Sequence, residues 1–124
     1  MLPYKRSKRI GDLLREEIAD IVMRRVKDPR LGFLTVTSVE VTDDLKIARV
    51  YVSVLNKDET RLTLDILTSA KGFIRSELRR RVRMKVIPEL EFHEDESIEY
   101  GARIDELLER IKREDEGEGS RGTG

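Results

Sequence analysis

The sequence predicts an α+β fold in which helices pack on a three-stranded sheet. Apolar residues recur at helical spacing in several segments of the 124-residue chain. Residues 33–55 are instead rich in β-branched residues and alternate in hydrophobicity, which is typical of a pair of strands. A short alternating segment near residue 90 supplies the third strand. The expected order is α-β-β-α-α-β-α.

The first helix is expected over residues 6–26. Ile10, Leu14, Ile18 and Val22 are spaced four apart and therefore share one helix face. The helix should end before Pro29, because the residue that precedes a proline is pushed out of the helical region.

The two strands are expected at residues 33–42 and 46–55, joined by a turn at Asp43-Asp44. In the first strand Leu34 and Val36 are even-numbered, whereas Val39 and Val41 are odd-numbered. A slip of one residue would turn half of the strand to water, so a β-bulge is expected near Thr37-Ser38.

A second helical pattern runs from residue 62 to residue 82, and Pro88 is expected to end this segment. The small residues around Ala70-Lys71-Gly72 predict a kink there, since glycine costs about 0.5–1 kcal/mol relative to alanine inside a helix. A close backbone approach, or no role at all, are the alternatives for Gly72. Residues 89–93 follow as the third strand.

Three segments are expected along the chain. Residues 1–97 form the folded domain, residues 98–113 an amphipathic C-terminal helix, and residues 114–124 a disordered tail without apolar side chains.

The formal net charge is zero, with 25 basic and 25 acidic residues, but the charges are segregated. Basic residues are in excess over residues 1–30 and 71–85, and acidic residues over 89–118. This asymmetry indicates a polyanionic partner. The chain has no cysteine, no apolar run near the roughly 18 residues of a membrane span, and no apolar segment after its basic start. A cytoplasmic protein without a membrane or secretory segment is expected.

The basic residues of the second helical segment follow a regular spacing. Lys71, Arg75, Arg79 and Arg83 are four apart and are expected to form one stripe, flanked by Arg80. Like charges at this spacing repel by about 0.2–0.5 kcal/mol per pair. The stripe is therefore better suited to binding phosphates than to stabilising a helix. The alternative is a solvated face whose repulsion is offset by acids on neighbouring elements.

A second basic cluster lies at the start of the first helix, where its charge opposes the helix dipole. It contains Lys5, Arg6, Lys8 and Arg9. Anion binding explains this placement, and a frayed solvated terminus is the alternative.

No catalytic, cofactor or metal site is expected. His93 is the only histidine and falls on the outward phase of its strand. Asp43-Asp44 is better explained as a turn than as metal ligands. The sequence contains no phosphate-binding glycine motif.

Five segments occur together in the order KRSKRIGDLLREEIADI, VKDPRLGFLTVTSVEVT, DLKIARVYVSVL, SAKGFIRSEL and VIPELEFHEDESIEYGARIDELL. In this combination the sequence resembles the bacterial ribosome-binding factor A family. The resemblance covers about residues 5–111. It implies a type II KH-like fold in which Ala70-Lys71-Gly72 replaces the GxxG loop that clamps RNA in ordinary KH domains.

The resemblance also implies a function. Such proteins are monomeric, non-enzymatic assembly factors that bind the immature 30S subunit and its 16S rRNA, assist maturation of the rRNA 5′ end, and are linked to cold adaptation. The expected RNA contacts here are Lys5, Arg6, Lys8, Arg9, Lys71, Gly72, Arg75, Arg79, Arg80 and Arg83. A general module for single-stranded nucleic acid is the alternative, which the scarcity of aromatic residues disfavours. A nuclease is the third class considered, and the sequence lacks the catalytic residues that a nuclease needs.

Overall fold

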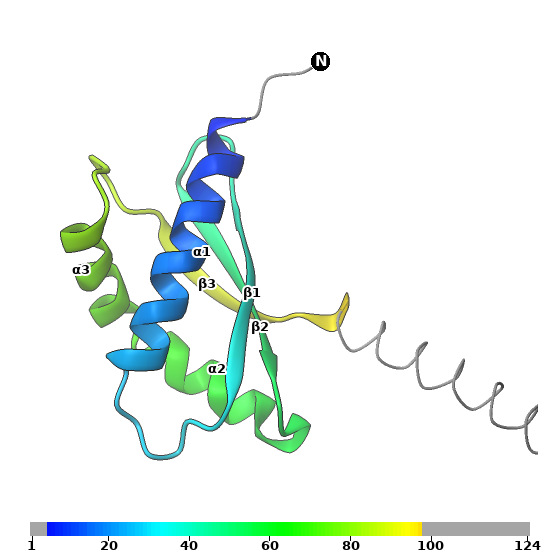
Figure 1. The fold of residues 1–124 in the computed structure, drawn as a ribbon. Coiled ribbons are helices and arrows are strands. Elements are labelled where there is room, and N and C mark those ends of the chain that lie inside the picture. Colours follow the sequence, from blue (N-terminus) through cyan, green and yellow to red (C-terminus); the bar gives the residue numbers. More distant parts are fainter. Residues whose placement is uncertain (1–4, 98–124) are drawn as a thin grey trace, which may run out of the picture. The chain divides into compact units, whose positions relative to one another are not determined.

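The computed structural model describes residues 5–97. The elements are α1 (Arg6–Arg24), β1 (Leu34–Val41), β2 (Ile47–Val54), a 3-10 helix η1 (Lys57–Glu59), α2 (Thr60–Ser69), α3 (Lys71–Arg81) and β3 (Glu89–Glu94) (Figure 1). This order confirms the predicted one as far as β3. The helix expected over 98–113 and the tail expected over 114–124 lie outside the described residues.

The sheet has the order β1-β2-β3, with β2 antiparallel to β1 and parallel to β3. The register of the hairpin shifts between Val36 and Ser38, which confirms the predicted bulge. The Thr37 hydroxyl donates a hydrogen bond of 3.2 Å to the Tyr51 carbonyl at this point. The bulge lets both halves of β1 bury their apolar side chains, since Val36 and Val39 are each buried.

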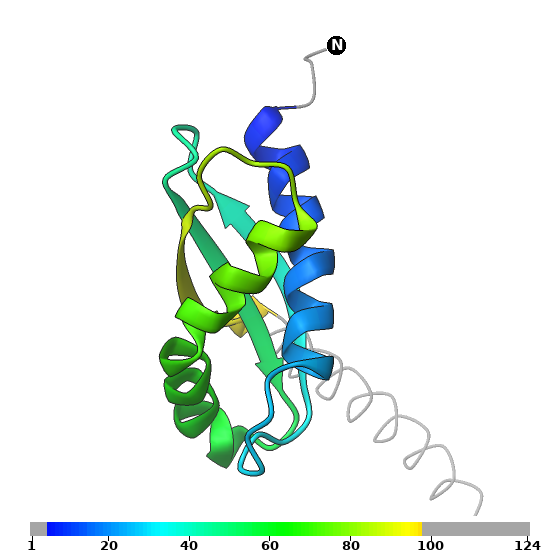
Figure 2. The same ribbon diagram turned by 90° about the vertical axis from the view of Figure 1, so that its left-hand side faces the viewer.

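The helices cover one face of the sheet (Figure 2). Alternate residues of β2 face them, so that Ala48, Val50, Val52 and Val54 are buried, and Leu90 of β3 is buried beside them. The helical side of this core is supplied by Leu14, Ile18, Ile21, Leu67, Ile74 and Leu78. The apolar faces predicted from the sequence periods are therefore the faces that pack.

Gly11 of α1 lies directly against β1. A Cβ atom built on Gly11 would lie 2.5 Å from the Val39 carbonyl oxygen. Only a glycine allows the helix backbone to approach the strand this closely. Its role was not predicted from the sequence, because a glycine inside a helical pattern does not show what it packs against.

The break between α2 and α3 falls at Ala70, which confirms the predicted kink. The Ala70 N–H bonds to the carbonyls of Ile66 and Leu67, and α3 then begins at Lys71. A Cβ atom added to Gly72 would meet no atom of a packing neighbour within 4 Å. A close approach of another described helix to Gly72 is therefore ruled out.

The expectation that the helix continues towards Pro88 is wrong. Helix α3 ends at Arg81, and Val82 adopts an extended backbone with φ −120° and ψ 144°. The physical reason is the position of β3 beside β2: the chain must leave the helix early to cross to that strand. Val82 and Ile87 are buried along this crossing segment.

Candidate nucleic-acid interface

The predicted basic stripe is only partly helical. Lys71, Arg75 and Arg79 occupy successive turns of α3, whereas Arg83 lies beyond the last helical residue. Arg79 and Arg83 are exposed and form no ion pair with any other described residue. These two guanidinium groups are the members of the stripe most available to an anion.

Arg75 uses its guanidinium group for contacts within the domain. Its Nη2 donates to the Ile87 carbonyl at 2.8 Å, its Nε donates to the Pro88 carbonyl at 3.1 Å, and Nη1 lies 3.7 Å from Glu89. Its side chain is 24% exposed. Arg75 thus links α3 to the entrance of β3, a role that the spacing of basic residues does not reveal.

Other cations of α3 are neutralised by acids on neighbouring turns or on α1. Arg81 donates to Asp20 at 2.6 Å and to Glu17 at 3.3 Å. The hydrogen bond from Arg81 lowers the pKa of the Asp20 carboxyl, and Asp20 in turn raises the pKa of Arg81. Arg80 lies 3.9 Å from Glu77. Within the stripe, Lys71 and Arg75 share Glu89 of β3 at 3.6 and 3.7 Å. The expected alternative of a charge-balanced face therefore describes Lys71, Arg75, Arg80 and Arg81, but not Arg79 or Arg83.

Three of the four residues of the N-terminal cluster lie in the first turns of α1, and Lys5 is its N-cap. No acidic residue occupies the first turn, and Lys5 makes no side-chain cap hydrogen bond. Lys8 pairs with Asp12 at 3.6 Å. Arg6 and Arg9 are exposed and form no ion pair within the part of the chain that the structure describes.

The fold brings the two basic regions together at one end of the domain. Figure 2 shows the start of α1, the β1–β2 turn and the segment between α3 and β3 at the same end. A groove of about 790 Å³ lies there, and its lining includes Arg6, Lys46, Arg83 and Lys85. Lys46 was missed from the sequence, because a single lysine after a turn gives no sign of the groove that it joins. We call this feature the end groove.

The break at Ala70 borders a different and smaller hollow of about 320 Å³. Its lining includes Arg25, Lys27, Ala70 and Phe73. None of the predicted RNA contacts lines this hollow, whereas Arg6, Arg75 and Arg83 line the end groove.

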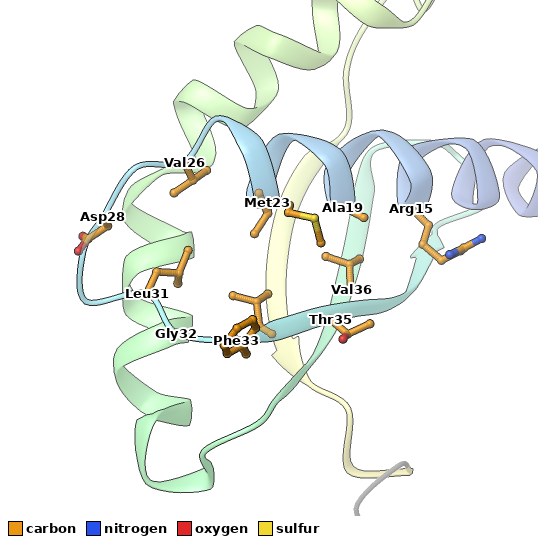
Figure 3. Close-up of a pocket in the computed structure, with 12 residues that line it drawn as sticks. Arg15, Ala19, Met23, Val26, Asp28, Leu31, Gly32, Phe33, Thr35 and Val36 are labelled. Carbon is orange, nitrogen blue, oxygen red and sulfur yellow. The ribbon is translucent and has the colours of Figure 1, made fainter.

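A third hollow, of about 570 Å³, lies between α1 and β1 (Figure 3). Its lining is mostly apolar, with Val26, Leu31 and Phe33 near Asp28 at one end and Arg15 at the other. None of the predicted RNA contacts lines it.

The acidic and imidazole groups form no metal site among residues 5–97. His93 is exposed on the outer face of the sheet, as predicted, and its Nε2 lies 3.2 Å from Glu91. No helix within these residues is long and apolar enough to cross a membrane.

Comparison with known proteins agrees with this architecture. The family model for ribosome-binding factor A matches residues 6–108, which is most of the chain. The chain belongs to the ribosome-binding factor A family. A curated ribosome-binding factor A from Thermodesulfovibrio yellowstonii is 56% identical over 116 residues, which cover 94% of this chain and 98% of the relative.

Solved structures of the family show the same KH-like fold. The crystal structure of the Thermus thermophilus factor is 31% identical with a TM-score of 0.65, covering 71% of this chain and 94% of that one. A homology model of the Thermus thermophilus factor, fitted into the cryo-electron-microscopy map of a 30S complex of that factor, is also similar. It is 32% identical with a TM-score of 0.60, covering 70% of this chain and 92% of that one.

Proposed function

We propose that this chain binds the 30S ribosomal subunit during its assembly through the basic surface formed by α3 and the end groove. Membership of the family supports this proposal, as does the similarity to a factor fitted into the map of a 30S complex. The observation that carries it in this chain is the set of cations without an ion pair among the described residues, above all Arg79 and Arg83. Such cations neutralise rRNA phosphates and release the counterions condensed on the RNA, which drives binding.

The proposed mechanism is steric and electrostatic. The rigid domain holds a segment of 16S rRNA in one conformation while the subunit completes late maturation, including processing of the rRNA 5′ end. Release follows when the mature RNA no longer offers this geometry. We also propose that the chain acts as a monomer in the cytoplasm, that it supports assembly in the cold, and that it catalyses no reaction.

The helix break supports a mode of binding other than the KH clamp. A GxxG loop clamps four nucleotides by their backbone. Here Ala70 continues helical hydrogen bonding into the break, and Gly72 is exposed beside open space. We therefore include Gly72 and Lys71 as peripheral contacts, with binding dominated by phosphates along α3.

Co-sedimentation with immature and mature 30S particles over a salt series tests this proposal. The double variant Arg79→Glu/Arg83→Glu should lose binding without a change in thermal stability, because neither side chain has an ion-pair partner among residues 5–97. The double variant Lys57→Glu/Arg61→Glu on η1 and α2 is a control with the same change of net charge, and its thermal stability is measured too because Arg61 pairs with Asp65 at 3.5 Å. Equal loss in both variants would show a response to net charge alone, and intact binding by the first would refute the assigned surface.

Two further measurements test the alternative functions, a general nucleic-acid-binding module and a nuclease. Affinity for bare oligonucleotides equal to that for subunits, at matched salt, would favour the module. Metal-dependent cleavage of precursor rRNA by the purified protein would contradict a non-catalytic role.

A further inference from the structure

The end groove combines free positive charge with an apolar floor. The floor includes Ile10 and Leu13 from α1 and Met84 and Val86 from the segment after α3. Leu13 is 44% exposed and Val86 is 69% exposed. A surface that contacts only phosphates has no use for exposed aliphatic side chains, since these neither pair with charge nor donate hydrogen bonds.

We propose that the end groove holds an unstacked nucleotide of single-stranded RNA, with the base on the apolar floor and the flanking phosphates on the cationic rim. This inference rests on the proposed function and adds a ligand class to one part of that surface.

The rim is matched to an anion. Arg6, Lys46, Arg83 and Lys85 form no ion pair with any residue among 5–97, whereas the fifth cation, Arg75, is held by backbone carbonyls. Both carboxylates that line the groove are already engaged. They are Asp44 and Glu89.

The engagement of these acids is specific. Asp44 accepts hydrogen bonds from the Thr42 hydroxyl at 2.6 Å and from the Lys46 N–H at 3.1 Å. Glu89 lies 3.6 Å from the Lys71 ammonium and 3.7 Å from Arg75. The hydrogen bonds from Thr42 and Lys46 lower the pKa of the Asp44 carboxyl, and the nearby Lys46 ammonium lowers it further. Arg6, Arg83 and Lys85 are thus the groove cations that neither acid offsets, and the groove keeps a positive potential through them.

The β1–β2 turn contributes a strained apolar residue to the same groove. Leu45 has φ 61° and is the only non-glycine residue with positive φ among those described. Its N–H bonds to the Thr42 carbonyl at 2.8 Å. The left-handed region favours glycine and asparagine, and short hairpin loops require it after their turn. A leucine at this position places an aliphatic side chain in the groove that neither of the favoured residues would supply.

These features select single-stranded RNA. Bases inside an A-form duplex are stacked and do not reach an aliphatic surface, whereas a splayed base does. Apolar side chains can sandwich an extruded base as aromatic ones do. An acidic peptide would also satisfy the rim, so polyglutamate serves as a competitor in the experiment.

The experiment compares the wild-type chain with Leu13→Ser/Val86→Ser, which keeps every charge and alters two exposed side chains. The probes are a short oligouridine, the same backbone abasic at every position, the duplex of the oligouridine with oligoadenylate, and polyglutamate. We expect wild type to prefer the single strand to the duplex. The double variant should bind oligouridine about tenfold more weakly, which is the lower end of the loss for removing an aromatic stacking partner of one base and suits an aliphatic floor.

The abasic probe should bind wild type and the double variant with equal affinity, because without a base the probe has nothing to place on the apolar floor. Equal affinity of wild type for the intact and abasic strands, or for strand and duplex, would overturn the proposal. So would unchanged oligouridine binding by the double variant, or equal competition by polyglutamate. Arg83→Glu/Lys85→Glu, with Lys57→Glu/Arg61→Glu as its control, tests the rim independently, and thermal melting checks that each variant folds.

The outcomes separate this inference from the proposed function. Wild type that co-sediments with 30S particles while the floor variant binds oligouridine normally would refute the base site alone. Wild type that binds oligouridine through the floor without co-sedimenting with 30S particles would refute the proposed function alone.

Discussion

The close contact between Gly11 and β1 predicts that the variant Gly11→Ala is less stable than the wild-type chain, and a second glycine of the same domain provides the control. An alanine at position 11 would place its Cβ 2.5 Å from the Val39 carbonyl oxygen, a distance that real structures do not contain. The obstacle is backbone, so no side-chain rotation relieves it. Helix α1 must move away from the strand, which loosens the packing of Leu14 and Ile18 on the sheet.

The magnitude follows from two opposing effects. Overpacking a well-packed core costs about 1–3 kcal/mol, and the expected cost is in the upper half of this range because the contact is rigid. Alanine recovers about 0.8–1.0 kcal/mol of helix propensity relative to glycine. The expected net loss in the free energy of unfolding is about 1–2 kcal/mol, which lowers the Tm by roughly 5–15 °C for a domain of this size.

Gly72→Ala is the matched control, because it makes the same chemical change in a helix where the new Cβ meets open space. It should raise the free energy of unfolding by up to about 1 kcal/mol. Urea unfolding of the three proteins followed by circular dichroism measures both effects. A Gly11→Ala variant as stable as Gly72→Ala would refute the argument from backbone contact.

Further predictions concern individual side chains. Arg75→Ala should lower the free energy of unfolding by about 1–2 kcal/mol, because two carbonyls lose a charged donor, whereas Arg79→Ala should change it by less than about 0.5 kcal/mol; urea melts distinguish the two. Hydrogen bonds from Arg30 lower the pKa of Asp28 from 3.8 to about 2, so the stability contributed by this pair is complete above about pH 4 and is lost as the pH falls towards 2. Asp28→Asn should remove that part of the acid dependence of Tm, and an unchanged profile would contradict it. Arg83→Ala should reduce the slope of log affinity for 30S particles against log salt by about 0.7–0.9, the value for one phosphate contact.

Short-range patterns in the sequence predicted most of the fold. The change of phase around residue 37 predicted the β-bulge, because only an extra residue keeps Val36 and Val39 on one face. Small residues before Lys71 predicted the helix break. These features depend on neighbours along the chain, which a sequence shows directly.

Features that depend on distant segments were not predicted. The early end of α3 is set by where β3 must lie, and the role of Arg75 by carbonyls that the crossing segment brings to it. Lys46 reaches the end groove only because the hairpin turn lies beside the start of α1. Charge spacing therefore identified a basic region, but did not separate cations used by the fold from cations left free.

The parallel pairing of β2 with β3 also bears on how the domain folds. The hairpin of β1 and β2 closes through local contacts, but β3 pairs with β2 across the whole intervening segment of α2 and α3, so we expect this pairing to form after the hairpin. Until then one edge of β2 has no strand beside it, and such an edge is a template for aggregation. We therefore expect docking of β3, which Arg75 secures, to be the late and rate-limiting step of folding. Variants that weaken this contact should slow folding to the extent that the contact is already formed in the transition state.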